Sequence, residues 1–356
     1  MRELTVMIKP VSGLCQMACD YCFYHDLAEY GAPANTRMSQ KTARQLIARV
    51  KESGARRVHF AFQGGEPLLW GQEHFDDFFE DVKEAGLDAT YAVQTNGLVL
   101  TDAVYCSIFA EHDVLVGISL DGDRALHDMA RKTPDGKGTY ERVVRGIEQL
   151  KKYGVRYNLL TVISANTARH PAQLYKFYKK MGVSHVQLIP CLPPLEKDAP
   201  GKYAPTPEAL GQFLIGFYRL WREDFKGGQP PFSVREFDQA LATLQGRGGF
   251  CGACGFCTPQ LIVEADGSTY PCDFYVLPKY CTGNVQEHSI QQTLHSEGMR
   301  RFADEHPTAP ELCRSCRFLP VCGGGCRRMR DVILSETECA MMRLYTYMIE
   351  KEKNAR

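Results

Sequence analysis

The sequence predicts an α/β fold, in which an open partial barrel of six βα units precedes a short cysteine-rich domain. Up to about residue 230, short runs rich in β-branched and aromatic residues alternate with amphipathic helical patterns. Beyond that point the composition changes, since ten of the fifteen cysteines lie between Cys251 and Cys339. We therefore expect a barrel domain over 1–230, a cysteine-rich domain over 231–345 and a helical tail over 346–356.

Six runs read as buried strands, because each is short, apolar and bounded by turn residues. They are LTVMI (4–8), RVHFAF (57–62), ATYAVQ (89–94), VLVGISL (114–120), YNLLTVI (157–163) and HVQLI (185–189). Their alternation with helices predicts parallel strands with right-handed crossovers. Six βα units are two short of a closed eight-fold barrel, so the sequence indicates a partial barrel, a (β/α)6 fold.

The helices between these strands are predicted from apolar residues at helical spacing. The candidates are residues 39–53, 72–86, 140–154 and 171–182, and Ser39 is placed to cap the first of them. In the cysteine-rich domain, Asp266-Gly267 predicts the turn of a β-hairpin. The rest of that domain is short and irregular, so we expect it to bury little core and to need metal to fold.

The composition excludes several classes of protein. Lys plus Arg and Asp plus Glu are equal at 42 each, so no overall charge favours nucleic acid or an acidic membrane surface. The N-terminal residues do not resemble a signal segment, and no apolar run approaches the roughly 20 residues that span a bilayer. We expect a cytoplasmic protein, in which clustered cysteines act as metal ligands rather than as disulfides.

The polar motifs follow the ends of the predicted strands, where parallel α/β folds carry function. QGGEP (63–67), QTNG (94–97) and SLDG (119–122) follow the second, third and fourth strands. Gly64 and Gly65 allow close approach of a ligand, and Glu66 can pair with an ammonium group. Taken alone, such segments are more often ordinary turns or caps, and their joint placement is what indicates a site.

The first strand is followed by Cys15, Cys19 and Cys22, a C-x3-C-x2-C triplet with Tyr21 before its last cysteine. Three thiolates leave one iron of a four-iron cluster open to a ligand. This motif resembles the signature of the radical S-adenosylmethionine (SAM) enzymes, whose open iron binds the methionine part of SAM. The resemblance implies a [4Fe-4S] cluster and SAM as cofactors.

The cysteine-rich domain carries a second array, C-x2-C-x5-C-x3-C from Cys313 to Cys326. On spacing alone, structural zinc and iron–sulfur are both open. The upstream triplet favours iron–sulfur, and the order of cysteines is similar to the SPASM domain, which binds two auxiliary [4Fe-4S] clusters. Through IKP, CDYCFYH, FAFQGGEP, QTNG, TARH, YPCDFYV and C-x3-CRR, nearly the whole chain resembles the anaerobic sulfatase-maturating enzymes.

The resemblance to this family implies roles for individual residues. It assigns the cysteine triplet to the SAM-cleaving cluster. It assigns the auxiliary clusters to two sets of four: Cys251, Cys257, Cys272 and Cys326, and Cys313, Cys316, Cys322 and Cys339. The residues implied to contact SAM are Tyr21, Gly65, Ser119, Arg131 and Leu192, beside Glu66. Tyr24 and Gln63 are implied to lie near a peptide substrate, and Asp273 is implied to act as the base.

Four cysteines are left without an assigned cluster. Cys106 and Cys191 are expected to pack as small apolar residues in the βα domain. Cys254 and Cys281 lie in the ligand-rich region, and we interpret both as spare thiols. For Cys254 a second interpretation stays open, in which it replaces Cys251 or Cys257 as a ligand.

The family resemblance implies a radical oxidation of a cysteine or serine in a sulfatase to Cα-formylglycine. The substrate would be a Cys/Ser-x-Pro/Ala-x-Arg segment, and a flavodoxin- or ferredoxin-type protein would donate electrons. A 5′-deoxyadenosyl radical would remove one Hβ, Asp273 would take the thiol or hydroxyl proton, and the auxiliary clusters would take the electron. Two alternatives stay open: a SPASM enzyme that installs thioethers or epimerised residues in a ribosomal peptide, and a zinc-binding or electron-transfer module.

Overall fold

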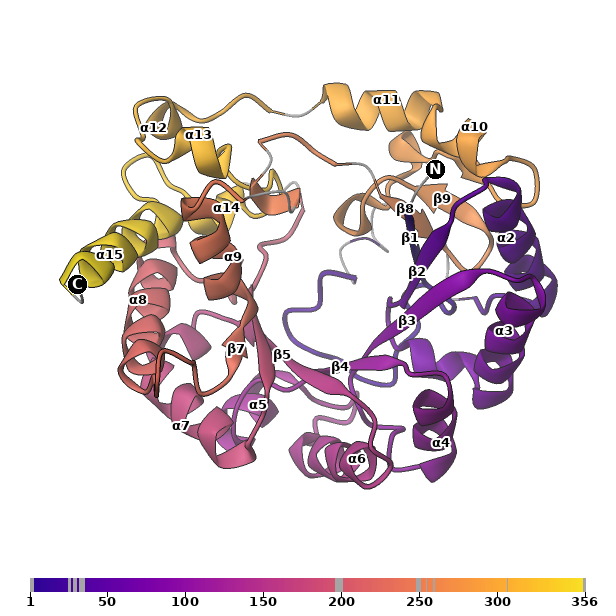
Figure 1. The fold of residues 1–356 in the computed structure, drawn as a ribbon, viewed down its shortest axis with the longest axis horizontal. Helices are drawn as coiled ribbons and strands as arrows, with labels where there is room; N and C mark the ends of the chain where they lie inside the picture. The colour runs from indigo at the N-terminus through magenta and orange to yellow at the C-terminus, as the bar shows by residue number, and fades with distance from the viewer. Residues whose placement is uncertain are drawn as a thin grey trace. The chain divides into compact units, whose positions relative to one another are not determined.

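The computed structural model describes residues 3–24, 27, 31, 36–195, 201–247, 251–253, 255–258, 260–305 and 307–354. It contains two compact units (Figure 1). Unit 1 is made of Met1–Ser119, Arg131–Tyr157 and Pro259–Glu305, and unit 2 of Leu120–Ala130, Asn158–Thr258 and His306–Arg356. Each unit combines distant segments of the chain, so these units follow packing rather than the linear division into 1–230, 231–345 and 346–356, which stays a prediction.

The sheet of unit 1 has the strand order β10-β9-β8-β1-β2-β3-β4. Strands β1 to β4 are parallel, and β8 extends them as a further parallel partner of β1 before the antiparallel β9 and β10. The strands are β1 (Glu3–Ile8), β2 (Arg57–Phe62), β3 (Asp88–Thr95), β4 (Leu115–Ser119), β8 (Leu261–Val263), β9 (Ser268–Tyr270) and β10 (Gly283–Asn284).

Helices cover the outer face of this sheet, as Figure 1 shows for α2 and α3 beside β1 to β3. Alternate residues of β2 are buried, and the ring of Phe62 packs edge-on against Phe78 of α3 at 5.1 Å between ring centroids. Ser39 caps α2 by accepting the backbone N–H of Thr42 at 3.1 Å. The helices of unit 1 are α2 (Gln40–Glu52), α3 (Gln72–Glu84), α4 (Ala103–Glu111), α6 (Tyr140–Lys152), α10 (Ile290–Leu294) and α11 (Glu297–Asp304).

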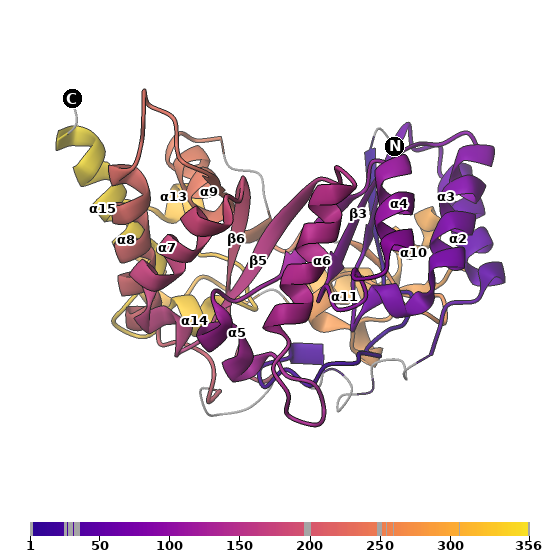
Figure 2. The same cartoon turned by 90° about the horizontal axis from the view of Figure 1, so that it is seen from below.

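Unit 2 contains the parallel strands β5, β6 and β7 in that order. Helix α8 packs between α7 and α15, which Figure 2 shows beside it. The strands are β5 (Tyr157–Ile163), β6 (His185–Pro190) and β7 (Ser233–Val234). The helices are α5 (Arg124–Ala130), α7 (Pro171–Met181), α8 (Pro207–Glu223), α9 (Arg235–Leu244), α12 (Glu311–Arg314), α13 (Leu319–Cys322), α14 (Arg330–Ile333) and α15 (Ala340–Asn354).

The predicted strands and helices of the βα domain are confirmed to within two residues at each end. The hairpin turn at Asp266-Gly267 is also confirmed, since Gly267 has a φ of +85° between β8 and β9. Helix α15 spans Ala340–Asn354, and the described part of the expected helical tail lies within it.

The expectation that the cysteine-rich region buries little core is wrong. All three residues of β8 are buried, and Tyr280 and Phe302 are each 1% exposed. The reason is that β8 pairs with β1 and so joins the sheet of unit 1, against which the irregular segment buries its apolar side chains. A short seventh parallel strand, β7, and helix α8 were not predicted.

Candidate active site

The cysteine triplet lies on the loop that leaves the end of β1, and two neighbouring segments of unit 1 hold this loop by backbone hydrogen bonds. The N–H groups of Gly65 and Glu66 donate to the carbonyls of Ser12 and Leu14, each at 2.8 Å. The N–H of Ala18 donates to the carbonyl of Lys132, also at 2.8 Å. The glycine-rich loop after β2 therefore shapes the cysteine loop directly.

The thiols of the triplet share one electrostatic environment. Burial, together with the charges of Glu66, Cys19 and Cys22, raises the pKa of Cys15 to about 12, although a hydrogen bond from the N–H of Met17 opposes the shift. The amide of Asn96 donates to Cys15 Sγ at 3.6 Å. Such a set of mutually repelling thiolates is stabilised when a cationic iron centre binds it, so the donor set fits the predicted cluster.

Glu66 is fully buried and organises the loops after β2 and β3. Its Oε1 accepts the hydroxyl of Thr95 at 2.7 Å and the N–H of Leu68 at 3.1 Å, and its Oε2 accepts the N–H of Asn96 at 2.7 Å. Burial raises its pKa to about 7, although these hydrogen bonds oppose the shift. The carboxylate thus braces the loops, and its predicted contact with an ammonium group stays a prediction.

Two glycines make close approach of the loops possible. A Cβ on Gly64 would lie 2.7 Å from the carbonyl oxygen of Ser12, and φ at this residue is +121°. A Cβ on Gly65 would overlap the backbone of Gly13 and Leu14. Gly65 is therefore required by the cysteine loop itself, whatever its contact with SAM.

The other residues predicted to contact SAM lie at strand or helix ends. Ser119 is the last residue of β4 and is 8% exposed. Arg131 is equally buried, and its guanidinium lies 5.5 Å from the ring centroid of Tyr21, which joins two predicted SAM contacts within unit 1. Leu192 is half-buried on the segment after β6 and belongs to unit 2.

Asp273 is brought together with both residues predicted to lie near the substrate. Asp273 as a whole is 5% exposed. Gln63 Nε2 donates to Oδ2 at 2.8 Å, and the hydroxyl of Tyr24 donates to Oδ2 at 3.1 Å and to Oδ1 at 3.3 Å. Burial, together with the Asp273 charge, raises the pKa of Tyr24 well above its usual range, so the phenol stays a neutral donor.

Two further residues complete this cluster, and sequence reasoning did not select either. Lys9 Nζ lies 2.7 Å from Asp273 Oδ1 and 3.1 Å from Glu264 Oε1. Burial by itself lowers the pKa of Lys9, but the two carboxylates outweigh burial and raise it. A lysine directly after an apolar strand was the available signal, since a charge at the end of a buried strand needs a partner.

Three of the cysteines predicted for the first auxiliary cluster lie together in unit 2. Burial raises the pKa of Cys257, the charges of Cys251 and Cys326 raise it further, and Arg327 opposes them. The fourth, Cys272, belongs to unit 1, where it precedes Asp273 at the start of a short 3-10 helix. Cys254 lies outside the described residues.

The four cysteines predicted for the second auxiliary cluster all belong to unit 2. Burial raises the pKa of Cys339, and the charges of Cys313 and Cys322 add to it; Cys316 has the same effect on Cys322. Gly323, Gly324 and Gly325 all have positive φ and turn the chain after Cys322. Arg330 holds this turn, because its Nε donates to the carbonyl of Gly324 at 3.1 Å.

Three of the cysteines outside these sets lie in the described residues, and their role as spare thiols stays a prediction. Cys106 and Cys191 are buried, as predicted, and Cys281 is exposed. No disulfide joins any of the cysteines in the described ranges. Among these same residues, no three His, Cys, Asp or Glu side chains form a site for a single metal ion.

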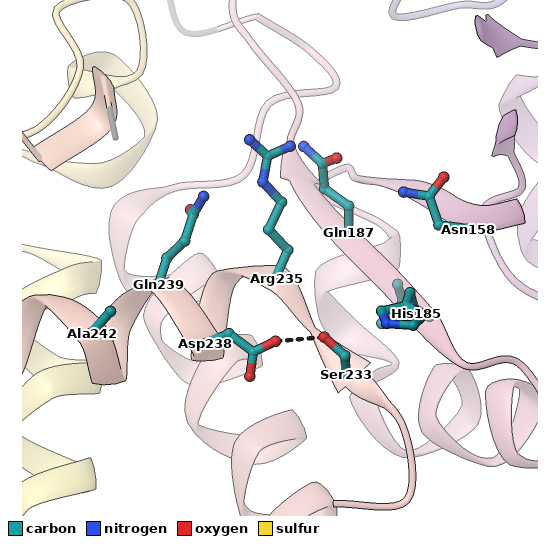
Figure 3. Close-up of a pocket in the computed structure, with 9 residues that line it drawn as sticks. Asn158, His185, Gln187, Ser233, Arg235, Asp238, Gln239 and Ala242 are labelled. Carbon is teal, nitrogen blue, oxygen red and sulfur yellow. Dashed lines mark hydrogen bonds between the residues drawn. The ribbon is translucent and has the colours of Figure 1, made fainter. Parts of the chain in front are cut away.

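A separate pocket of unit 2 contains none of the predicted site residues. Its volume is about 410 Å³, and the side chains of β5, β6, β7 and α9 surround it (Figure 3). Its lining residues are Asn158, His185, Val186, Gln187, Ser233, Arg235, Asp238, Gln239 and Ala242.

This chain is a radical SAM enzyme that carries an iron–sulfur SPASM domain. Three features define this class: the cysteine loop, the glycine-rich loop and the cysteine-rich C-terminal region. Residues 10–178 match the Radical SAM superfamily, and residues 254–317 match SPASM, an iron-sulfur cluster-binding domain. More narrowly, the chain belongs to the anaerobic sulfatase-maturating enzymes. The predicted family, fold class and enzyme class are thereby confirmed.

The relatives include both types of this family. The chain is 37% identical over 342 residues to the cysteine-type enzyme of Clostridium perfringens, which covers 93% of this chain and 90% of the relative. It is 30% identical over 350 residues to the serine-type enzyme of Bacteroides thetaiotaomicron, with coverage of 92% and 84%.

Solved structures of the family share the fold. The structure of native anSMEcpe with bound AdoMet has a TM-score of 0.90 and 35% identity, and covers 99% of each chain. The structure of the same enzyme with AdoMet and the Cp18Cys peptide has a TM-score of 0.89 and 34% identity, and covers 99% of this chain and 98% of that one. In the described part of this chain, no helix has the length and apolar character to cross a membrane.

Proposed function

We propose that this chain oxidises a cysteine or serine side chain in a sulfatase polypeptide to Cα-formylglycine, with SAM and three [4Fe-4S] clusters as cofactors. The observation that carries the proposal is the buried Asp273 carboxylate, which accepts hydrogen bonds from Tyr24 and Gln63. Membership of the family supports it, because both cysteine-type and serine-type relatives align over nine-tenths of this chain. The higher identity to the cysteine type makes a cysteine peptide the first substrate to test.

The cysteine residues fit the proposed clusters. Cys15, Cys19 and Cys22 would hold the SAM-cleaving cluster, with Tyr21, Gly65, Glu66, Ser119, Arg131 and Leu192 around SAM. Cys251, Cys257, Cys272 and Cys326 would hold the first auxiliary cluster, and Cys313, Cys316, Cys322 and Cys339 the second. When bound, these groups supply a 5′-deoxyadenosyl radical that removes one Hβ and a one-electron acceptor for the resulting carbon radical.

The chain's own residues handle the proton. Asp273 accepts it from the thiol or hydroxyl of the substrate, so that loss of one proton and one electron leaves a C=S or C=O double bond. Tyr24 and Gln63 donate to the same carboxylate and orient it toward the peptide. A thioaldehyde then takes up water and releases hydrogen sulfide, which gives the formylglycine aldehyde.

We also propose a flavodoxin- or ferredoxin-type electron donor, because the N-terminal cluster needs a strong one-electron reductant. Residues 1–230 would form the SAM-binding domain and 231–345 the domain of the auxiliary clusters, with 346–356 as a helical tail. The matched ranges 10–178 and 254–317 support this division.

The test is anaerobic incubation of the reconstituted protein with SAM, a reductant and a peptide that contains Cys-x-Pro-x-Arg, followed by mass spectrometry. Conversion to the aldehyde with release of 5′-deoxyadenosine is the expected result. A matched Ser-x-Pro-x-Arg peptide then tests whether the protein also accepts serine as its target residue. Release of 5′-deoxyadenosine with an unchanged sulfatase peptide would contradict the proposal and favour another peptide substrate.

A further inference from the structure

Lys9 is a buried cation that the reaction outlined above does not use. Its Nζ lies 2.7 Å from Asp273 Oδ1 and 3.1 Å from Glu264 Oε1, and none of the three side chains is more than 7% exposed. We propose that Lys9, held by Glu264, is a positioning residue that fixes the Asp273 carboxylate and reserves its Oδ2 oxygen for the substrate proton. This inference rests on the proposed function and names the acceptor atom within it.

The two oxygens of Asp273 have partners of different kinds. Oδ1 receives the ammonium of Lys9, whose side chain is 2% exposed, at 2.7 Å, and also the hydroxyl of Tyr24 at the longer distance of 3.3 Å. Oδ2 receives Gln63 at 2.8 Å and Tyr24 at 3.1 Å, the two residues expected beside the substrate. Neutral donors can exchange for a substrate thiol or hydroxyl at little cost, whereas breaking a buried ion pair leaves uncompensated charge. Oδ2 is therefore the oxygen that becomes available.

The surroundings of Lys9 leave it little freedom to move. Its backbone N–H donates to the carbonyl of Val263 at 2.8 Å, which ties the end of β1 to β8. A Cβ on Gly64 would lie 3.4 Å from Lys9 Cβ, so the alkyl stem packs directly on the glycine-rich loop. The ammonium also lies 4.8 Å from the ring centroid of Tyr24, at cation–π distance. Three segments of unit 1, beside the one that carries Asp273, thus converge on Lys9.

The charges of the three side chains explain why Glu264 is needed to position Lys9. Lys9 supplies one positive charge between two buried carboxylates, so its removal would leave Asp273 and Glu264 to repel each other without compensation. The Asp273 carboxylate would then rotate, and its Oδ2 oxygen would leave the position beside Gln63 and Tyr24. Glu264, directly after β8, holds the ammonium through a second ion pair of 3.1 Å and so prevents Lys9 from following Asp273.

The experiment compares Lys9→Met with Lys9→Met/Glu264→Gln in the reconstituted holoenzyme. The double variant loses one positive and one negative charge together, so it keeps the net charge of the cluster. Its reference is Glu264→Gln alone, and the matched control is Lys83→Met, which removes an exposed lysine paired with Glu80. We measure iron content, the dissociation constant of the Cys-x-Pro-x-Arg peptide without reductant, and the ratio of 5′-deoxyadenosine to formylglycine.

We expect this ratio to rise at least about tenfold in both Lys9 variants, since a displaced base loses much of a typical 10²- to 10⁴-fold contribution. Peptide affinity, iron content and the ratio in Lys83→Met should stay at wild-type values. If Lys9→Met loads less iron than the wild type, the double variant decides the question.

A wild-type ratio in the double variant would overturn the inference. An equal loss of 5′-deoxyadenosine and product would also overturn it, because that result indicates a merely structural lysine. If the wild type itself cleaves SAM but leaves the peptide unchanged, the proposed function fails, and the positioning role fails with it.

Discussion

The carboxylate of Glu66 ties the loop after β2 to the end of β3 through Asn96. Its Oε2 accepts the backbone N–H of Asn96 at 2.7 Å, while Oε1 accepts the hydroxyl of Thr95 at the same distance. The side chain of Asn96 in turn donates to Cys15 Sγ at 3.6 Å. One buried acid therefore connects two strand ends to the cysteine loop.

Glu66→Gln should destabilise the protein by about 1–3 kcal/mol, because a glutamine carbonyl cannot accept all three hydrogen bonds and one buried N–H loses its partner. The thermal midpoint of the reconstituted protein is the measurement. Glu80→Gln, which changes an exposed acid on α3, is the control and should leave the midpoint unchanged. Equal midpoints for both variants would show that Glu66 does not brace the loops.

Gly65→Ala should selectively empty the N-terminal cluster, since a Cβ at this position overlaps the backbone of the cysteine loop. Iron analysis should find a loss of about four of about twelve irons per chain. The control is Gly216→Ala within α8, where a Cβ would meet only Pro171 at 3.4 Å. A full iron content in Gly65→Ala would contradict the close approach of the two loops.

Asp273→Asn should lower formylglycine formation by about 10²- to 10⁴-fold, because an amide cannot accept the substrate proton. Release of 5′-deoxyadenosine should continue, since Asp273 lies outside the predicted SAM contacts. Both products are quantified in one anaerobic reaction by mass spectrometry. Unchanged formylglycine formation would remove Asp273 from the mechanism.

Cys281→Ser should keep the full iron content, because Cys281 is exposed and its thiol lies 3.6 Å from the carbonyl of Gly283. Cys272→Ser, in the same region, should lower it, since Cys272 is a predicted ligand of the first auxiliary cluster. The two variants are compared by iron and sulfide analysis after identical reconstitution. Loss of iron in Cys281→Ser would make this thiol a ligand.

Glu236 predicts a pH dependence of stability. Its side chain accepts the N–H of Leu188 at 2.7 Å, and burial raises its pKa from 4.5 to about 7. The folded state therefore binds more protons than the unfolded state between these values, so the free energy of unfolding falls as pH rises through this window. The free energy of unfolding falls by at most about 3 kcal/mol across this window, and above it this loss no longer changes with pH.

Glu236→Gln should abolish this component, so the thermal midpoint of the variant should rise relative to that of the wild type from pH 5 to pH 7, and the difference should level off above that range. Glu208→Gln, an exposed acid in the first turn of α8, is the matched control. A difference that does not change with pH would show that Glu236 does not titrate in this range.

The sequence predicted those features that depend on neighbours along the chain. The spacing of Cys15, Cys19 and Cys22 defines a three-thiolate loop in any fold, and short runs of β-branched and aromatic residues such as Arg57–Phe62 form strands whose bounds are confirmed. Asp266-Gly267 likewise predicted its turn from local backbone preference alone. Helix α8 was not predicted, although its buried residues recur at helical spacing and Thr206 caps its start; they are Leu210, Phe213, Leu214, Phe217, Tyr218 and Trp221.

Only the tertiary structure decided which distant residues meet. The pairing of β8 with β1 joins Val6 to Leu261, and nothing local to either segment specifies this partner. That pairing brings Glu264 and Asp273 to Lys9, so the ion pairs of the candidate site follow from sheet topology. Local sequence determined the chemistry of each loop, because thiols, glycines and turns act through their own backbone. Long-range strand pairing decided the partners of Asp273, because a buried charge is stabilised only by what the fold places around it.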